Sequence, residues 1–413
     1  MTPHCASPVS HDDERHECAP RSSLAIDGGP PVRDAPLPGP YPGACLIDGQ
    51  EEEQVLQVLR SKSLFRFYGP GLLRKAEACE QEIASRMAAQ NALLVNSGTS
   101  ALKCALYAAG VARGDEVLVP AYSYVATADV VLTLGAKPVF VEVDDSLTMD
   151  PDDIERKITE RTTAITPVHL FGVAADMEGI LALAKRYRLR VVEDCAQSFG
   201  ARFGGRHVGS WGDAGITSFQ LNKVITAGEG GAIWSNDEGL FDRAVRLHDH
   251  GNFRSAGASV TLVGEGLRMS ELSAAVLLAQ LGKLNTILAR LRTAKGYLIG
   301  RLKGIPGLQL ARIPDSEGDG AAAVLASVRS PELCEQVVAA MNAEGIRVLR
   351  QYGGLPLYLQ PEMVAAHVGY AGLCPITEAL VARTLFLGLS SDFTRRDLDD
   401  VIAAFGKVLH ALA

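Results

Sequence analysis

One lysine in this chain, Lys223, stands in a setting that suits covalent chemistry on a carbonyl group. It precedes the glycine-rich run 227–231, and upstream of it the apolar run 189–192 ends in an acidic pair that includes Asp194. A lysine amine can form a Schiff base with an aldehyde cofactor, and a carboxylate can keep a pyridine nitrogen protonated so that the ring accepts electrons. These residues therefore predict a pyridoxal 5'-phosphate (PLP) enzyme in which Lys223 and Asp194 are catalytic.

Small and hydroxyl-bearing residues near two predicted strands can bind the phosphate of such a cofactor. Gly98, Thr99 and Ser100 lie between a short apolar run and a helical pattern. Backbone N–H groups at a helix N-terminus, together with two hydroxyls, suit a dianion. The same pattern alone is also that of an ordinary helix N-cap. Ser218, upstream of Lys223, offers one more hydroxyl at a strand end.

Two further side chains follow predicted strands at positions from which they can approach a cofactor. Tyr124 comes shortly after the apolar run 116–119, and an aromatic ring there can stack on a pyridine ring. His169 follows the run 164–168. Its position suits a contact with the cofactor and a buried core histidine equally well.

The elements that must hold these residues alternate along the chain. Short apolar runs and amphipathic stretches follow one another between residues 92 and 194. This alternation predicts an α/β protein whose largely parallel sheet lies between helices. Ligands of such sheets bind at the carboxyl ends of the strands, which is where the polar motifs fall.

Three regions are expected along the chain. Residues 1–22 are polar and read as a disordered tail, and residues 23–290 form an N-terminal arm and a large cofactor-binding domain. Residues 291–413 form a linking helix and a smaller C-terminal α/β domain, in which a strand is expected over 346–349. A long helical pattern over 270–302 joins the two domains, and the loop-like stretch 304–320 is the candidate boundary.

Composition indicates a soluble globular protein and excludes several other classes. Of the 413 residues, 47% are hydrophobic and 21% charged, with a net charge of −8 and no basic block, which argues against a nucleic-acid partner. No stretch of about eighteen uninterrupted apolar residues predicts a membrane span. The first residues lack the apolar core of a secretory signal.

The cysteines point to a reducing compartment. The chain has eight, scattered and without a Cys-x-x-Cys pair, and several lie within apolar helical patterns. This usage is typical of reduced thiols and predicts a cytoplasmic location. Histidines and cysteines near the start match no standard zinc spacing, so no metal site is predicted.

The segments above follow one another as in a known family. The chain resembles the DegT/StrS-type family of PLP-dependent sugar and cyclitol aminotransferases, which have the fold-type I architecture with a seven-stranded-type sheet. The resemblance extends over roughly residues 25–405. It is carried by the segments 96–102, 114–127, 135–140, 167–172, 192–200, 212–223 and 268–272.

The resemblance implies a role for each candidate residue. Lys223 would hold the resting cofactor and later move a proton, while Asp194 would pair with the pyridine nitrogen. Relatives that dehydrate sugars carry a histidine at the position of Lys223, so the lysine favours transamination. The residues that match the family's other cofactor contacts are Gly98, Thr99, Ser100 and Ser218 at the phosphate, Tyr124 on the ring face, and Gln197 beside the ring and its 3-hydroxyl, with His169 nearby.

Two positions depart from the family pattern. Relatives commonly carry an asparagine that reaches the partner subunit's phosphate where this chain has Gly266. Asn252 or Arg254 is the expected replacement for that contact. Relatives also carry a histidine where this chain has Tyr358, which is therefore expected to be a substrate residue and indicates an acceptor other than the common nucleotide-sugar 4-ketones.

The resemblance implies an enzyme that transfers an amino group from glutamate or glutamine to a keto-sugar, a keto-cyclitol or a related ketone. Aminosugar, secondary-metabolite or surface-glycan biosynthesis would use such a reaction. The family also implies a homodimer with active sites at the interface. A PLP-dependent sugar dehydratase, an aminoshikimate-type synthase and a non-catalytic PLP-binding regulator are the alternatives. The acceptor, and the choice between glutamate and glutamine, stay open.

Overall fold

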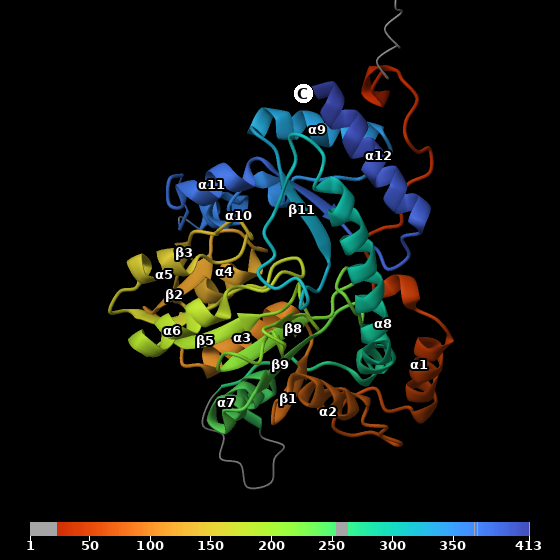
Figure 1. Ribbon diagram of the computed structural model, residues 1–413. Coiled ribbons are helices and arrows are strands. Elements are labelled where there is room, and N and C mark those ends of the chain that lie inside the picture. The colour runs from red at the N-terminus through yellow and green to blue at the C-terminus, as the bar shows by residue number, and fades with distance from the viewer. Residues whose placement is uncertain (1–22, 253–262, 367, 370, 413) are drawn as a thin grey trace, which may run out of the picture.

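The computed structural model describes residues 23–252, 263–366, 368–369 and 371–412. Within these ranges the chain forms a large domain around one sheet and a smaller domain around another. Helix α8 (Glu271–Leu302) runs from one domain to the other (Figure 1). The tail expected over residues 1–22 lies outside the described residues.

A seven-stranded sheet organises the large domain. Its strands are β1 (Asn91–Val95), β2 (Glu116–Pro120), β3 (Lys137–Val141), β4 (Thr162–Ile165), β5 (Arg190–Asp194), β8 (Ala214–Ser218) and β9 (Gly231–Ser235). Their order is β1-β9-β8-β5-β4-β2-β3, and β9 alone runs in the direction opposite to the other six strands. The mostly parallel sheet confirms the predicted fold class. The sequence analysis does not predict β9, which returns beside β8 because residues 219–230 form a compact loop between them.

Helices cover both faces of this sheet. They are α2 (Lys75–Met87), α3 (Gly98–Ala108), α4 (Ala126–Thr133), α5 (Pro151–Lys157), α6 (Met177–Tyr187) and α7 (Glu238–His248), whereas α1 (Gly49–Ser61) packs against α8. Successive strand residues point to opposite sides, so a strand buried on both faces is apolar throughout. On β1, Leu93 packs in the cluster that contains Leu102 of α3, whereas Leu94 packs in the cluster that contains Ile83 of α2. A short hairpin, β6 (Arg202–Phe203) and β7 (Arg206–His207), lies outside the sheet.

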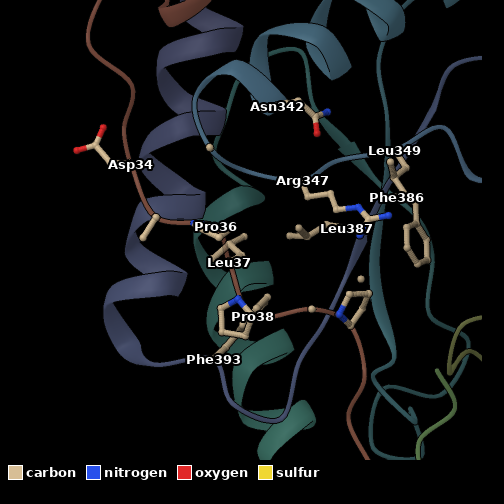
Figure 2. A pocket seen from close by; sticks show the side chains of 15 residues that line it. Asp34, Pro36, Leu37, Pro38, Asn342, Arg347, Leu349, Phe386, Leu387 and Phe393 are labelled. Atoms are coloured by element: carbon tan, nitrogen blue, oxygen red, sulfur yellow. The ribbon is translucent and has the colours of Figure 1, made fainter. Parts of the chain in front are cut away.

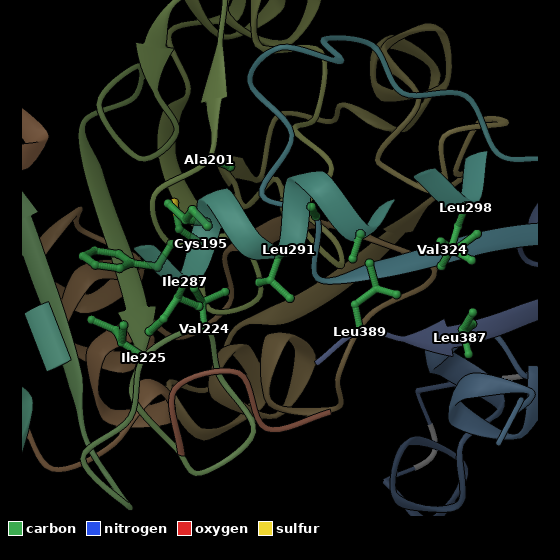
Figure 3. Close-up of a cluster of buried hydrophobic side chains, with 14 of the residues drawn as sticks. Cys195, Ala201, Val224, Ile225, Ile287, Leu291, Leu298, Val324, Leu387 and Leu389 are labelled. Carbon is green, nitrogen blue, oxygen red and sulfur yellow. The ribbon is translucent and has the colours of Figure 1, made fainter. Parts of the chain in front are cut away.

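The long helix α8 is a core element of both domains. By length and composition alone it could cross a membrane, but fifteen of its residues are buried within the protein. Figure 3 shows Ile287 and Leu291 near Val224 and Ile225 of the large domain, while Leu298 lies near Val324 of the small domain. The expected domain limit at residue 290 falls inside this unbroken helix. One hydrophobic core therefore continues from the loop after β8 into the small domain.

The small domain is a three-stranded antiparallel sheet covered by helices. Its strands are β10 (Gln309–Leu310), β11 (Ala323–Ser327) and β12 (Thr384–Gly388), and its helices are α9 (Pro331–Ala343), α10 (Pro361–Ala365), α11 (Pro375–Val381) and α12 (Arg395–Leu412). A strand expected over 346–349 is reduced to one bridge, between Leu349 and Phe386. The chain then turns toward the large domain.

The N-terminal arm, residues 24–48, runs along the small domain before it reaches α1 (Figure 1). The buried carboxylate of Glu344 accepts the backbone N–H groups of Ala25 and Val32 at 2.8 and 3.0 Å. A cavity of about 440 Å³ opens between the arm and β12, with Leu37 and Arg347 among its walls (Figure 2). None of the predicted site residues lines this cavity.

Candidate active site

The carboxyl end of β5 supplies the acid of the site. Asp194 is 6% exposed, and its carboxylate accepts the N–H of Ala196 at 2.9 Å. Burial raises the pKa of Asp194, and the nearby charges of Lys223 and His169 oppose that rise. A buried carboxylate with one backbone donor still has room for a cationic N–H partner.

The neighbouring Glu193 has a structural role. It is fully buried and accepts the backbone N–H groups of Gly209, Trp211 and Gly212 at 2.7, 2.7 and 2.6 Å. Its Oε2 also lies 3.0 Å from Nε2 of His169. These bonds hold the loop before β8 against β5, and they leave Glu193 without capacity for a ligand.

Lys223 lies in the loop 219–230, which joins β8 to β9. Two anchors fix its position: Val224 and Ile225 are buried directly after it, and the hydroxyl of Thr226 donates to the carbonyl of Phe219 at 3.1 Å. Burial lowers the pKa of Lys223, while Asp194 and other acidic charge raise it again. Within the part of the chain that the structure describes, the amine has no hydrogen-bond partner. Such an amine is available for covalent attachment.

The N-terminus of α3 and the end of β8 meet at close range. A Cβ atom at position 98 would lie 2.6 Å from the Cβ of Ser218, so glycine is required for this approach. The N–H groups of Gly98 and Thr99, in the first turn of α3, have no intrahelical acceptor. Ser100 differs, because its N–H donates to Ser97 at 3.1 Å and its hydroxyl donates to Asn96 at 2.7 Å. Donors therefore remain at Gly98, Thr99 and Ser218, while Ser100 serves the helix cap.

Gln197 and Tyr124 face the same region. The Gln197 amide donates from Nε2 to the hydroxyl of Tyr352 at 3.2 Å. Its Oε1 is buried and has no partner among the described residues. The ring of Tyr124 is 55% exposed and lies 6.5 Å from the ring of Tyr352. An unpartnered buried oxygen beside an open aromatic face indicates a place for a polar, planar ligand.

His169 takes the second of the two roles left open for it. The ring is fully buried. Its Nδ1 accepts the N–H of Ala175 at 3.1 Å, so Nε2 carries the proton and donates to Glu193. Both ring nitrogens are thus used within the protein, and His169 supports the site from the core.

Tyr358 is not a substrate residue, contrary to the prediction. Its side chain is 0% exposed and its ring lies 5.3 Å from that of Phe140 in the core of the large domain. Its hydroxyl donates to Glu378 at 2.5 Å and accepts the N–H of Cys374 at 3.0 Å. The turn over Leu357–Leu359 points this side chain inward, which the sequence pattern does not reveal.

Asn252, one of the two residues expected to contact a partner subunit, lies in the segment after α7. Asn252 ends a short 3-10 turn with a left-handed φ of 57°, and its N–H donates to Asp249 at 2.7 Å. A Cβ at Gly266 would lie 3.4 Å from Nε2 of His250, an ordinary van der Waals contact with a flexible side chain. Arg254 lies outside the described residues.

Sequence reasoning missed Tyr352, which comes from the small domain. Its only signal is a glycine pair, Gly353 and Gly354, that follows the expected strand and marks a sharp turn. The structure places it beside Gln197 and Tyr124. The site therefore combines the ends of four strands, β1, β2, β5 and β8, with one turn of the small domain.

The residues present fit PLP. Free N–H and hydroxyl donors gather at one end for a phosphate, a buried carboxylate stands at Asp194 for a pyridine nitrogen, and an unpaired amine is available at Lys223. The orphaned oxygen of Gln197 provides a contact for a ring hydroxyl. This set of groups matches the cofactor in number and chemistry.

Comparison with known proteins agrees with this geometry. The model of the DegT/DnrJ/EryC1/StrS aminotransferase family matches residues 46–406. The chain is 35% identical over 338 residues to the UDP-N-acetyl-3-dehydro-alpha-D-glucosamine 3-aminotransferase of Acidithiobacillus ferrooxidans, covering 81% of this chain and 89% of that relative. It is 34% identical to the L-glutamine:2-deoxy-scyllo-inosose aminotransferase of Streptomyces kanamyceticus, covering 94% of this chain and 97% of the relative.

Solved structures show the same architecture. DesV of S. venezuelae superposes with a TM-score of 0.79 at 32% identity, covering 87% of this chain and 94% of that chain. 3-Amino-5-hydroxybenzoic acid synthase superposes with a TM-score of 0.81 at 26% identity, covering 92% of this chain and all of the other. The fold-type I architecture implied by the resemblance is confirmed. The chain belongs to the DegT/DnrJ/EryC1/StrS aminotransferase family.

Proposed function

We propose that this aminotransferase uses PLP to move an amino group from glutamate or glutamine to a ketone on a sugar or cyclitol ring. One observation carries the proposal: the unpartnered amine of Lys223 lies near the buried carboxylate of Asp194, beside a Gln197 oxygen that lacks a partner. Ionisable groups with shifted pKa values and polar atoms without hydrogen-bond partners are typical of active sites when they gather at strand ends.

The named relatives support the acceptor class. One acts on a UDP-linked 3-dehydro sugar and another on 2-deoxy-scyllo-inosose with glutamine, by their names. Both acceptors are six-membered rings with one ketone among hydroxyls. The shared chemistry is a polyhydroxylated cyclic ketone, and the nucleotide is not common to both.

Each residue of the site would have its own role in the reaction. When bound, PLP supplies the electron sink that lets an amino acid lose the proton on its α-carbon. Asp194 would hold the ring nitrogen protonated, and Lys223 would hold the resting cofactor covalently and then carry the proton from the donor's α-carbon. The N–H groups of Gly98 and Thr99 and the hydroxyl of Ser218 would bind the phosphate.

We also infer a homodimer, as the family resemblance implies. Apolar side chains that stay exposed on this chain favour association. Several of them lie on α1 and on the segment between α1 and α2, namely Leu56, Leu59, Leu64, Tyr68 and Leu73, each at least 41% exposed.

A panel assay tests the proposed reaction. The PLP-loaded protein is incubated with keto-sugars and inososes, free and nucleotide-linked, with glutamate or glutamine as the donor. Formation of an aminated ring and the matching 2-oxo acid from one pair supports the proposal. Loss of water from the acceptor without amination would assign a dehydratase, and bound PLP without turnover of any pair would favour the regulator.

A further inference from the structure

Tyr352 reaches from the small domain into the candidate active site. It lies in the short turn Gln351–Gly354 with φ of 53° and ψ of 31°, a left-handed conformation that costs a tyrosine free energy. Two backbone hydrogen bonds between Leu349 and Phe386 of β12, at 3.0 and 2.8 Å, fix the start of this turn. The small domain therefore holds Tyr352 in a strained but defined position.

The ring of Tyr352 packs among aromatic side chains of the large domain. It lies 5.5 Å from the ring of Tyr122 and 6.1 Å from that of Phe171, nearly parallel to the latter. Phe171 itself has a positive φ of 52°. Tyr124 completes the group at 6.5 Å and is open to solvent on its other side. This packing leaves the Tyr352 hydroxyl at the border of the site.

That hydroxyl bonds the Gln197 amide, whose Nε2 lies 3.2 Å from its oxygen, and the side chain of Gln351 also interacts with it. The hydroxyl can accept from Nε2 of Gln197 or, with the amide turned over, donate to Oε1. In either orientation one end of the amide bonds Tyr352 and the other end remains for a bound group. With the amide turned over, that remaining end is the N–H group.

We propose that Tyr352 is a positioning residue that holds the Gln197 amide so that its N–H group faces the ring hydroxyl of bound PLP. This inference rests on the proposed function, because the cofactor is the ligand. It links the seating of the small domain to the alignment of the cofactor. An N–H donor favours the deprotonated form of the ring oxygen, which absorbs visible light differently from the protonated form.

The test removes only the hydroxyl, with Tyr352→Phe. The aromatic packing is kept, so the protein should bind PLP, with affinity reduced about two- to tenfold. The midpoint of the pH titration of the visible PLP band should rise by about 0.5 to 1 pH unit, because the oxyanion loses its donor. Tyr122→Phe is the matched control, since its hydroxyl bonds the carbonyl of Gln351 at 3.1 Å and does not touch Gln197.

The substitutions at Tyr352 and Gln197 are then combined in one protein. Gln197→Leu should shift the titration in the same direction, and the double variant should shift it no further, because both changes remove one contact. An unchanged midpoint in Tyr352→Phe, an equal shift in Tyr122→Phe, or additive shifts in the double variant would each overturn the inference. The wild-type protein reports separately on the proposed function: if it binds PLP and transaminates, only the role of Tyr352 has failed.

Discussion

The carboxylate of Asp194 accepts a single backbone N–H, so most of its hydrogen-bonding capacity is free for the cofactor. Asp194→Asn keeps the size of the side chain but removes the charge that holds a pyridine nitrogen protonated. We expect PLP to remain bound and the first half-reaction to slow by a factor of about 10² to 10⁴, as measured by single-turnover spectroscopy. A near-normal rate would make Asp194 a structural residue.

Glu193→Gln is the matched control for that substitution. Its amide would present an N–H₂ group to backbone donors, which leaves buried donors unpaired. The free energy of unfolding should fall by about 1 to 3 kcal/mol. Denaturant titration should show this loss, while the fully folded variant keeps its half-reaction rate within an order of magnitude.

Lys223 should carry the cofactor. Borohydride reduction of the loaded protein followed by peptide mapping should place the pyridoxyl group on Lys223. Lys295 is an internal control, because it is also buried but pairs with Asp319 at 2.5 Å. A label on Lys295, or on any lysine other than Lys223, contradicts the assignment. Lys223→Ala should bind PLP without covalent attachment.

At the residue scale, sequence reasoning succeeds where a residue's neighbours in the chain determine its place. The neighbouring strands β5 and β8 end in Asp194 and Ser218, and Lys223 follows in the loop after β8. Their proximity therefore follows from the fold class. The positions of Tyr352 and Tyr358 do not, because each depends on how a short turn of the small domain is oriented. For Tyr352 that orientation is set by the Leu349–Phe386 bridge, and for Tyr358 by the N–H of Leu357, which donates to the carbonyl of Ala121 at 2.6 Å. Both contacts join residues far apart in sequence.

Among the elements, α3 depends on its first residue. A Cβ at position 98 would collide with Ser218, so Gly98→Ala should displace the start of the helix. We expect PLP affinity to fall at least about tenfold while the fold is kept, as measured by equilibrium dialysis. Gly296→Ala on α8 is the control, because nothing lies within 4 Å of its Cβ. That change should stabilise the protein by up to about 1 kcal/mol and leave PLP binding unchanged.

A buried ion pair fixes the segment between β10 and β11 to α8. Lys295 and Asp319 are both less than 7% exposed, and Gly320 next to Asp319 donates to the carbonyl of Gly172 at 2.8 Å. Asp319→Ala would leave a buried charge unpaired and should cost about 3 to 5 kcal/mol in unfolding experiments. Adding Lys295→Met should restore most of the lost free energy of unfolding, because the buried charge is then removed as well. Failure of the second change to restore stability would place the effect in the backbone of the segment.

The elements themselves were partly predictable. Amphipathic periodicity predicts the helix over 270–302 closely, because one face of α8 is buried along its whole length. The reversed strand β9 was not predicted, since three apolar residues, Ala232, Ile233 and Trp234, after a glycine-rich loop carry no sign of direction. The expected strand over 346–349 forms only one bridge, from Leu349 to the edge of β12 that does not face β11.

For the whole molecule, the central prediction is a dimer with shared sites. Light scattering should give twice the chain mass of 43.9 kDa. Lys223→Ala and Asn252→Ala should each be inactive alone, and mixed subunits should regain about a quarter of the wild-type activity if Asn252 acts on the partner's site. No recovery after confirmed subunit exchange would place Asn252 outside the partner's site, and a monomer would reject the dimer.

The anchoring of the N-terminal arm also has a consequence for how the chain is made. Ala25 bonds Glu344, and Arg33 bonds Asp397 and Asp400, so the contacts join residues that are 319 to 367 positions apart. A ribosome releases the first of these partners long before the last. The large domain can assemble during synthesis, whereas the arm has no place to bind until residues 344–400 have emerged. Docking of the arm therefore follows the synthesis of the small domain.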